Sequence, residues 1–104
     1  MENIYVVIDI LSNEEEIYSL DRQITLRGVF SSLENAKNAL ESLVDAALEK
    51  YSDAGHFPAT EPDREGVVYQ EIYGYEMFRG EINIYSIPLD KITDFLVEHA
   101  LYIE

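Results

Sequence analysis

The chain contains no cysteine and no tryptophan, and only 7 of its 104 residues are lysine or arginine. Without cysteine it can form no disulfide, thiol nucleophile or cysteine-based zinc site. This composition fits a reducing cytosol, and we expect a cytoplasmic protein. Nucleic acids and anionic lipids are bound through basic patches, which so few cations do not supply. Direct binding to nucleic acid or to a membrane is therefore not expected.

Long hydrophobic runs are also missing. The longest apolar run extends from Ile4 to Leu11, and Asp9 interrupts it, so it is too short to cross a bilayer. The segment Met1–Asn3 lacks the basic start and the apolar stretch of a signal peptide. Neither a membrane span nor a secretion signal is predicted.

Motifs for catalysis and cofactor binding are absent as well. The sequence has no G-x-S-x-G, P-loop or G-x-G-x-x-G pattern, each of which places a nucleophile or a phosphate at a defined turn. The two histidines, His56 and His99, follow no metal-ligand spacing. His56 lies three residues after Asp53, and a single such pair is little support for a general base. We expect no enzymatic activity, no cofactor and no metal site.

Acidic residues are what the chain has in excess: 21 Asp and Glu against 7 Lys and Arg give a net charge of −14. A net charge of about 2–8 is enough to keep a small domain soluble, and a larger one causes self-repulsion in the compact state. Apolar residues make up 47% of the chain, which is too many for a disordered acidic tail. We therefore expect one folded domain over residues 1–104, whose charge attracts a protein partner with a basic surface.

Alternating apolar residues predict two strands near the N-terminus, at residues 3–11 and 22–30. The first is apolar on both faces, which is typical of an inner strand. The second turns Ile24, Leu26 and Phe30 toward one face and polar residues toward the other, which is typical of a half-exposed strand. We expect the two strands to pair antiparallel.

An amphipathic helix of about five turns is predicted next. Ser31 and Glu34 have the spacing of a capping box at its start. Its apolar residues recur at steps of three and four and form one stripe. They are Leu33, Ala36, Leu40, Leu43, Val44, Ala47 and Tyr51. A last helix is predicted after Pro88, with Asp90 as its cap.

Two more strands are predicted at residues 67–78 and 81–87, joined as a hairpin around Arg79-Gly80. Residues 52–66, before the hairpin, contain two prolines and two glycines, so we expect a long mobile loop there. The predicted fold is α+β with the element order ββαββα. It is a four-stranded, mostly antiparallel sheet with two helices on one face.

The polar side of the first predicted helix is acidic. It carries Glu34, Asn38, Glu41, Asp45 and Glu49. Glu41, Asp45 and Glu49 follow one another at about 6 Å along the axis, a spacing comparable to that of phosphates along a nucleic-acid strand. This pattern indicates a surface that imitates nucleic acid or docks into a basic groove. The alternative is an ordinary solvated face, on which Lys37 forms helical ion pairs with Glu34 and Glu41.

A second acidic cluster, Glu14, Glu15 and Glu16, is expected at the tip of the first hairpin. Its spacing does not match that of a calcium-binding loop, so solubility or partner contact is favoured over a metal site.

The chain also has eight tyrosines, a residue type that is enriched at protein interfaces. Tyr18 and Tyr85 occupy predicted exposed or mixed positions and are candidates for partner contact. Tyr85 is also expected opposite Gly74, whose bare backbone its ring would cover. Tyr73 and Tyr75 are expected to fill the sheet.

The segments IYVV (residues 4–7) and GVFSS (residues 28–32), the latter followed by Glu34-x-Ala36, are similar to a known pattern. They resemble small phage and bacterial domains of unknown function in which a V-F-S-S strand end opens a helix. The resemblance covers about the first 50 residues and implies no functional residues. Size, acidity and tyrosine content are loosely similar to those of phage-encoded antagonists of host defence and of bacterial immunity proteins.

Together these features predict a small acidic inhibitor, encoded by a phage or mobile element and acting in the host cytoplasm. It would occlude a basic, nucleic-acid-handling site on a host defence protein. Three alternatives stay open. The first is a bacterial immunity protein that neutralises a toxin, and the second is a domain that binds a small molecule or a divalent metal through loop 52–66. The third is a homo-oligomer paired through a sheet face or edge.

Overall fold

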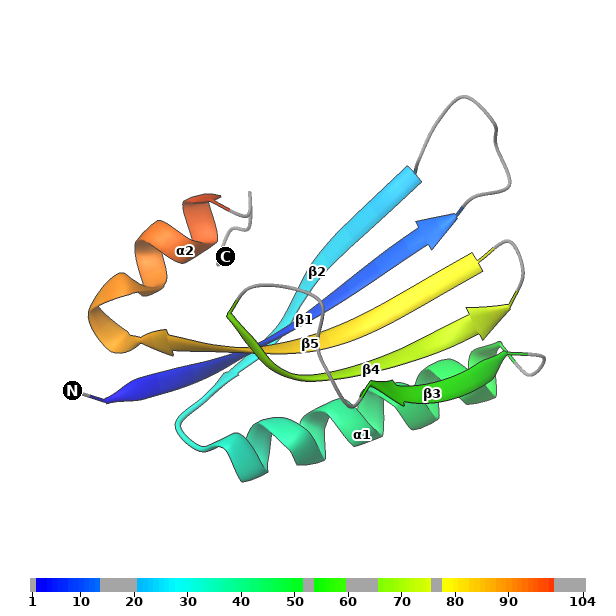
Figure 1. Ribbon diagram of the computed structural model, residues 1–104, viewed down its shortest axis with the longest axis horizontal. Helices are drawn as coiled ribbons and strands as arrows, with labels where there is room; N and C mark the ends of the chain where they lie inside the picture. The colour runs from blue at the N-terminus through cyan, green and yellow to red at the C-terminus, as the bar shows by residue number, and fades with distance from the viewer. Residues whose placement is uncertain (1, 14–20, 52–53, 60–65, 76–77, 99–104) are drawn as a thin grey trace.

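A computed structural model describes residues 2–13, 21–51, 54–59, 66–75 and 78–98. Five strands, two α-helices and a short 3-10 helix follow one another there (Figure 1). They are β1 (Asn3–Asn13), β2 (Asp21–Phe30), α1 (Leu33–Lys50), β3 (Gly55–Ala59), β4 (Val67–Tyr75), β5 (Phe78–Pro88), η1 (Leu89–Lys91) and α2 (Ile92–Glu98). The α+β class is confirmed, but the predicted order ββαββα is wrong.

The strands form one antiparallel sheet in the order β2-β1-β5-β4-β3. β1 pairs with β2 on one side and with β5 on the other, which confirms the inner position predicted for it. The sheet has five strands rather than the predicted four, because β3 pairs with β4 at its edge. β3 lies within residues 52–66, which were expected to form one loop. Its Pro58 offers no N–H to a ladder and is tolerated in an edge strand.

The predicted hairpin exists as β4 and β5, but its register is different. β4 ends at Tyr75 and β5 begins at Phe78, so Arg79 and Gly80 belong to β5 instead of joining the two strands. Tyr73 therefore lies opposite Gly80, and a Cβ atom on that glycine would overlap the Tyr73 ring. The predicted pairing of Tyr85 with Gly74 is wrong, because Gly74 lies opposite Arg79 and Tyr85 lies opposite Val67.

The two helices lie on opposite faces of the sheet, not on one face as predicted (Figure 1). α1 packs Leu40 and Val44 against the face that contains Val7. α2 packs Leu96 against the face that contains Val6. Because neighbouring residues of a strand point to opposite faces, the doubly apolar β1 supplies both cores.

α1 begins at a different serine from the one predicted. Its N-cap is Ser32 rather than Ser31, and the Ser32 hydroxyl accepts a hydrogen bond from the Asn35 amide over 3.1 Å. The predicted apolar stripe is confirmed, since all of its residues are buried or partly buried in the core beneath α1. Neither helix of the described ranges is both long and apolar enough to span a membrane.

Candidate functional site

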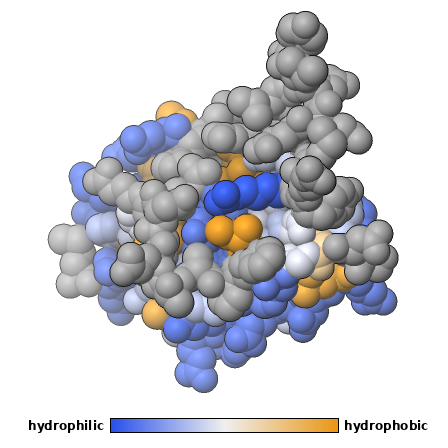
Figure 2. All heavy atoms as spheres, turned by 45° about the vertical axis from the view of Figure 1, so that its right-hand side comes forward, coloured by the Kyte–Doolittle hydropathy of each residue, from blue (hydrophilic) through white to orange (hydrophobic). Residues whose placement is uncertain are grey.

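The outer face of α1 displays four exposed carboxylates, which we call the acidic face. They are Glu34, Glu41, Asp45 and Glu49. Because a helix turns by about 100° per residue, these side chains fall within an arc of about 80°. α1 lies on the outside of the sheet, with no other described element over its outer side (Figure 1). Hydrophilic side chains line the lower border of the space-filling view, where α1 lies (Figure 2).

Neither lysine of α1 forms an ion pair with a carboxylate of the acidic face. The Lys37 amine lies 4.8 Å from the centroid of the Tyr69 ring, and the Lys50 amine lies 5.3 Å from that of Tyr51. Within the ranges that the structure describes, no carboxylate of the acidic face forms an ion pair. The ion pairs found there join Arg27 to Asp9, His56 to Glu71 and Arg79 to Glu81. The helical ion pairs considered for Lys37 are thus not formed.

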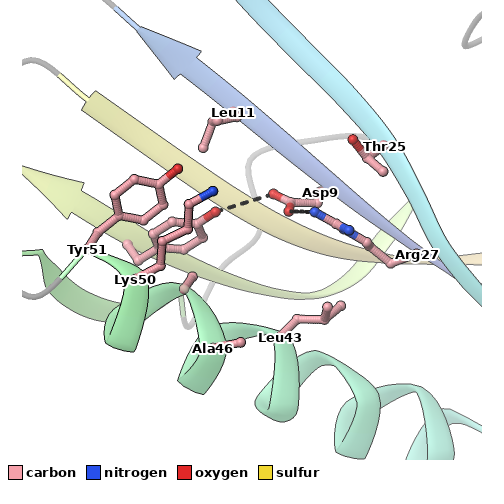
Figure 3. Close-up of a pocket in the computed structure, with 10 residues that line it drawn as sticks. Asp9, Leu11, Thr25, Arg27, Leu43, Ala46, Lys50 and Tyr51 are labelled. Atoms are coloured by element: carbon pink, nitrogen blue, oxygen red, sulfur yellow. Dashed lines mark hydrogen bonds and ion pairs between the residues drawn. The ribbon is translucent and has the colours of Figure 1, made fainter.

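A pocket of about 270 Å³ lies at the C-terminal end of α1, between this helix and the sheet (Figure 3). We call it the α1 pocket. Its apolar lining comes from Leu11, Leu43, Ala46 and Ala47. Its polar groups come from Asp9, Thr25, Arg27, Lys50, Tyr51 and Tyr73. The pocket therefore combines an apolar wall with charged groups of both signs.

A bulge in β2 positions Arg27 at this pocket. Leu26 and Gly28 pair with consecutive residues of β1, which leaves Arg27 without a partner in the ladder. A bulge redirects the side chain of the extra residue, and Arg27 Nη2 reaches Asp9 Oδ2 over 3.1 Å. Asp9 is only 9% exposed, and a buried carboxylate needs such a partner. The bulge and the ion pair thus depend on each other.

Tyr73 completes the polar side of the pocket. The residue is 3% exposed, and its hydroxyl donates a long hydrogen bond of 3.5 Å to Asp9 Oδ1. Burial, followed by the charge of Asp9, raises the pKa of Tyr73 well above its ordinary value, because both disfavour the phenolate. The Tyr73 hydroxyl therefore stays protonated at neutral pH and acts as a hydrogen-bond donor to Asp9.

A histidine–carboxylate pair joins β3 to β4. His56 Nε2 lies 2.9 Å from Glu71 Oε1, while the buried Glu71 Oε2 has no hydrogen-bond partner among the described residues. The general-base pair considered for His56 involved Asp53, which lies outside the described residues. In the described part of the chain, no three His, Cys, Asp or Glu side chains gather as metal ligands would.

A buried polar network lies on the other face of the sheet. Gln70 Nε2 donates to Asn83 Oδ1 over 2.7 Å, and Asn83 Nδ2 donates to Glu81 Oε1 over 3.1 Å. Arg79 pairs with Glu81 over 3.3 Å. Among the described residues, each buried polar side chain of this network has a partner, so the network leaves no group directed at a ligand on this face of the sheet.

The predicted surface role of Tyr85 is wrong. This residue is 5% exposed and its ring centroid lies 5.0 Å from that of Phe95 of α2. Tyr85 points into the core because α2 covers this face of the sheet, which the prediction of two helices on one face did not allow. The candidates Glu14, Glu15, Glu16 and Tyr18, together with His99, lie outside the described residues.

The residues of the α1 pocket were not among the predicted site residues. One signal was available, since Asp9 is a single charge in an otherwise apolar inner strand and such a carboxylate needs a partner. That the partner is Arg27 could not be predicted, because the bulge depends on how β2 pairs with β1.

No family model, curated protein or solved structure matches this chain. The resemblance at residues 4–7 and 28–32 stays an expectation, and no residue role is taken from another protein.

Proposed function

We propose that this protein is a non-enzymatic binding protein that docks the acidic face of α1 on a basic surface of another protein. One observation carries the proposal. Four carboxylates share one exposed helix face without an ion pair among the described residues, while both lysines of the helix lie over tyrosine rings. A row of like charges without ion pairs steers a partner of opposite sign and speeds association.

The partner we propose is a nucleic-acid-handling protein of a host defence system, inhibited by occlusion. A groove that holds a nucleic-acid strand is lined by cations along the backbone path. The carboxylates of Glu41, Asp45 and Glu49 repeat at about 6 Å along a rigid helix. These carboxylates can pair with the cations of such a groove in place of the phosphates of a nucleic acid.

Affinity capture from a lysate of the native host tests this function. The bait is the wild-type protein, E41Q/D45N/E49Q, or a control, E2Q/D90N/E98Q, which removes three charges from exposed positions outside α1. We expect the wild type and the control to retain the same protein and E41Q/D45N/E49Q to lose it. Short duplex DNA should release the retained protein, because both compete for one basic groove.

Two outcomes would contradict the proposal. Equal capture by both variants would mean that the acidic face is not the contact surface. Capture that depends on the acidic face but resists competing DNA would mean that the partner is bound away from any nucleic-acid groove.

A further inference from the structure

We propose that the α1 pocket is a binding site for a small organic monocarboxylate with an apolar body. This inference does not depend on the proposed function, because the pocket lies on the sheet side of α1 and the acidic face on its outer side. Three properties of the pocket carry the inference: its size and lining, its charge, and the directions of its charged side chains.

The size and lining fit a small ligand with an apolar part. An engineered apolar cavity of about 150 Å³ already binds benzene, and the α1 pocket offers about 270 Å³. Leu11, Leu43 and Ala47 line it together with the ring of Tyr51. Ligand sites typically combine such apolar walls with a few placed polar groups.

The charge of the pocket is opposite to that of the chain. Arg27 and Lys50 contribute two positive charges and Asp9 one negative charge, which leaves +1 in a protein of net charge −14. A ligand with one negative charge neutralises this excess. A phosphate dianion would instead leave a negative charge beside the buried Asp9, which is unfavourable at low dielectric. The lining therefore favours a monocarboxylate.

One of the two cationic side chains, that of Arg27, is held in place before any ligand binds. Lys50 and Tyr51 extend into the pocket from the end of α1, and Arg27 enters from β2 (Figure 3). Asp9 fixes one Nη of Arg27 over 3.1 Å, and the Arg27 side chain is still 42% exposed. A guanidinium has five N–H donors, so donors are left for a carboxylate, with the Lys50 ammonium as its second partner.

The test is a titration of the ¹⁵N-labelled full chain with sodium benzoate, followed by amide chemical shifts. Benzamide, which has the same shape without the charge, and inorganic phosphate are titrated separately. We expect saturable shifts at Thr25, Arg27, Lys50 and Tyr51 with benzoate, and no saturable shifts with the other two probes. These four amides report on both walls of the pocket.

Two lysine variants complete the test. K50M removes the ammonium from the pocket, and K37M makes the same change of charge on α1 beside Tyr69, outside the pocket. K50M should weaken benzoate binding by about tenfold or more, because a charge-assisted contact is lost. K37M should keep the affinity within about twofold.

Four results would overturn the inference. They are no saturable shift with benzoate, equal binding of benzamide, preferential binding of phosphate, and an equal loss of affinity in K37M and K50M. Any of the first three results would mean that the pocket does not select a monocarboxylate. The fourth would mean that the overall charge of α1, rather than Lys50 in the pocket, determines the affinity.

Discussion

Asp9 determines the polar character of the α1 side of the sheet. It is a nearly buried carboxylate in the central part of an inner strand, and Arg27 and Tyr73 each direct a donor at it. A buried charge is tolerated only when it is paired and hydrogen-bonded. The bulge at Arg27 and the burial of Tyr73 are therefore parts of one arrangement, which also forms the floor of the α1 pocket.

The shifted titration of Tyr73 predicts a stability change at high pH. Its folded-state pKa is raised above the ordinary value of about 10. As the pH rises, the unfolded chain therefore loses the Tyr73 proton at a lower pH than the folded chain. The contribution of Tyr73 to the free energy of unfolding is complete below about pH 10. It decreases as the pH rises further, by up to about 1.4 kcal/mol per pH unit.

Urea unfolding of the wild type and of Y73F between pH 8 and pH 11.5 measures this contribution. We expect the free energy of unfolding to fall more steeply above about pH 10 in the wild type than in Y73F, because the variant has no phenolic proton to lose at this position. Parallel pH profiles of the two proteins would contradict the raised pKa.

At the scale of elements, α1 depends on its N-cap. The Ser32 hydroxyl accepts from the Asn35 amide, so S32A should lower the free energy of unfolding by about 1 kcal/mol. S31A is the matched control, since Ser31 is exposed and should change stability by less than about 0.5 kcal/mol. Chemical denaturation of both variants measures the difference. If S31A lowered the free energy of unfolding more than S32A, the N-cap would be Ser31, as predicted from the sequence.

Elements with a strong local period could be predicted from the sequence, and elements defined by pairing could not. Apolar residues recur at a regular spacing along α1 and along β1, so the core residues of both elements were predicted correctly. β3 was missed because Gly55 and Pro58 favour a loop unless an edge strand accommodates them. The β4–β5 register was missed because Gly80 was assigned to a turn, whereas it is needed under the Tyr73 ring.

The same distinction between local spacing and strand pairing applies to the candidate sites. The carboxylates of the acidic face were predicted from helical spacing, and all four are exposed. The α1 pocket was not predicted, because it combines residues from β1, β2, β4 and the end of α1. Only strand pairing and the bulge bring Asp9 and Arg27 together.

For the whole molecule, the net charge of −14 acts over distances comparable to its size. At about 0.01 M salt the Debye length of about 30 Å exceeds the radius of gyration of 14.0 Å. Most charges of the folded chain then repel one another, and the unfolded chain relieves this repulsion. The acidic face adds to it, because like charges four residues apart destabilise a helix.

Neutralising the acidic face should therefore stabilise the fold. E41Q/D45N/E49Q removes two such i,i+4 pairs and should raise the free energy of unfolding by roughly 0.4–1 kcal/mol at low salt. The gain should shrink at about 0.15 M salt, where the Debye length is about 8 Å. Urea unfolding at both salt concentrations measures it. A less stable variant at low salt would indicate that the acidic face supports the fold rather than a partner.

The most direct test of the acidic face is the affinity of the captured partner, measured at about 0.05 and 0.2 M NaCl. The baits are the wild type, E41Q/D45N/E49Q and E2Q/D90N/E98Q. We predict that E41Q/D45N/E49Q binds at least about tenfold more weakly at low salt, with a flatter salt dependence, and that E2Q/D90N/E98Q stays close to the wild type. Equal affinities and equal salt dependence of the two variants would contradict the proposed role of the acidic face.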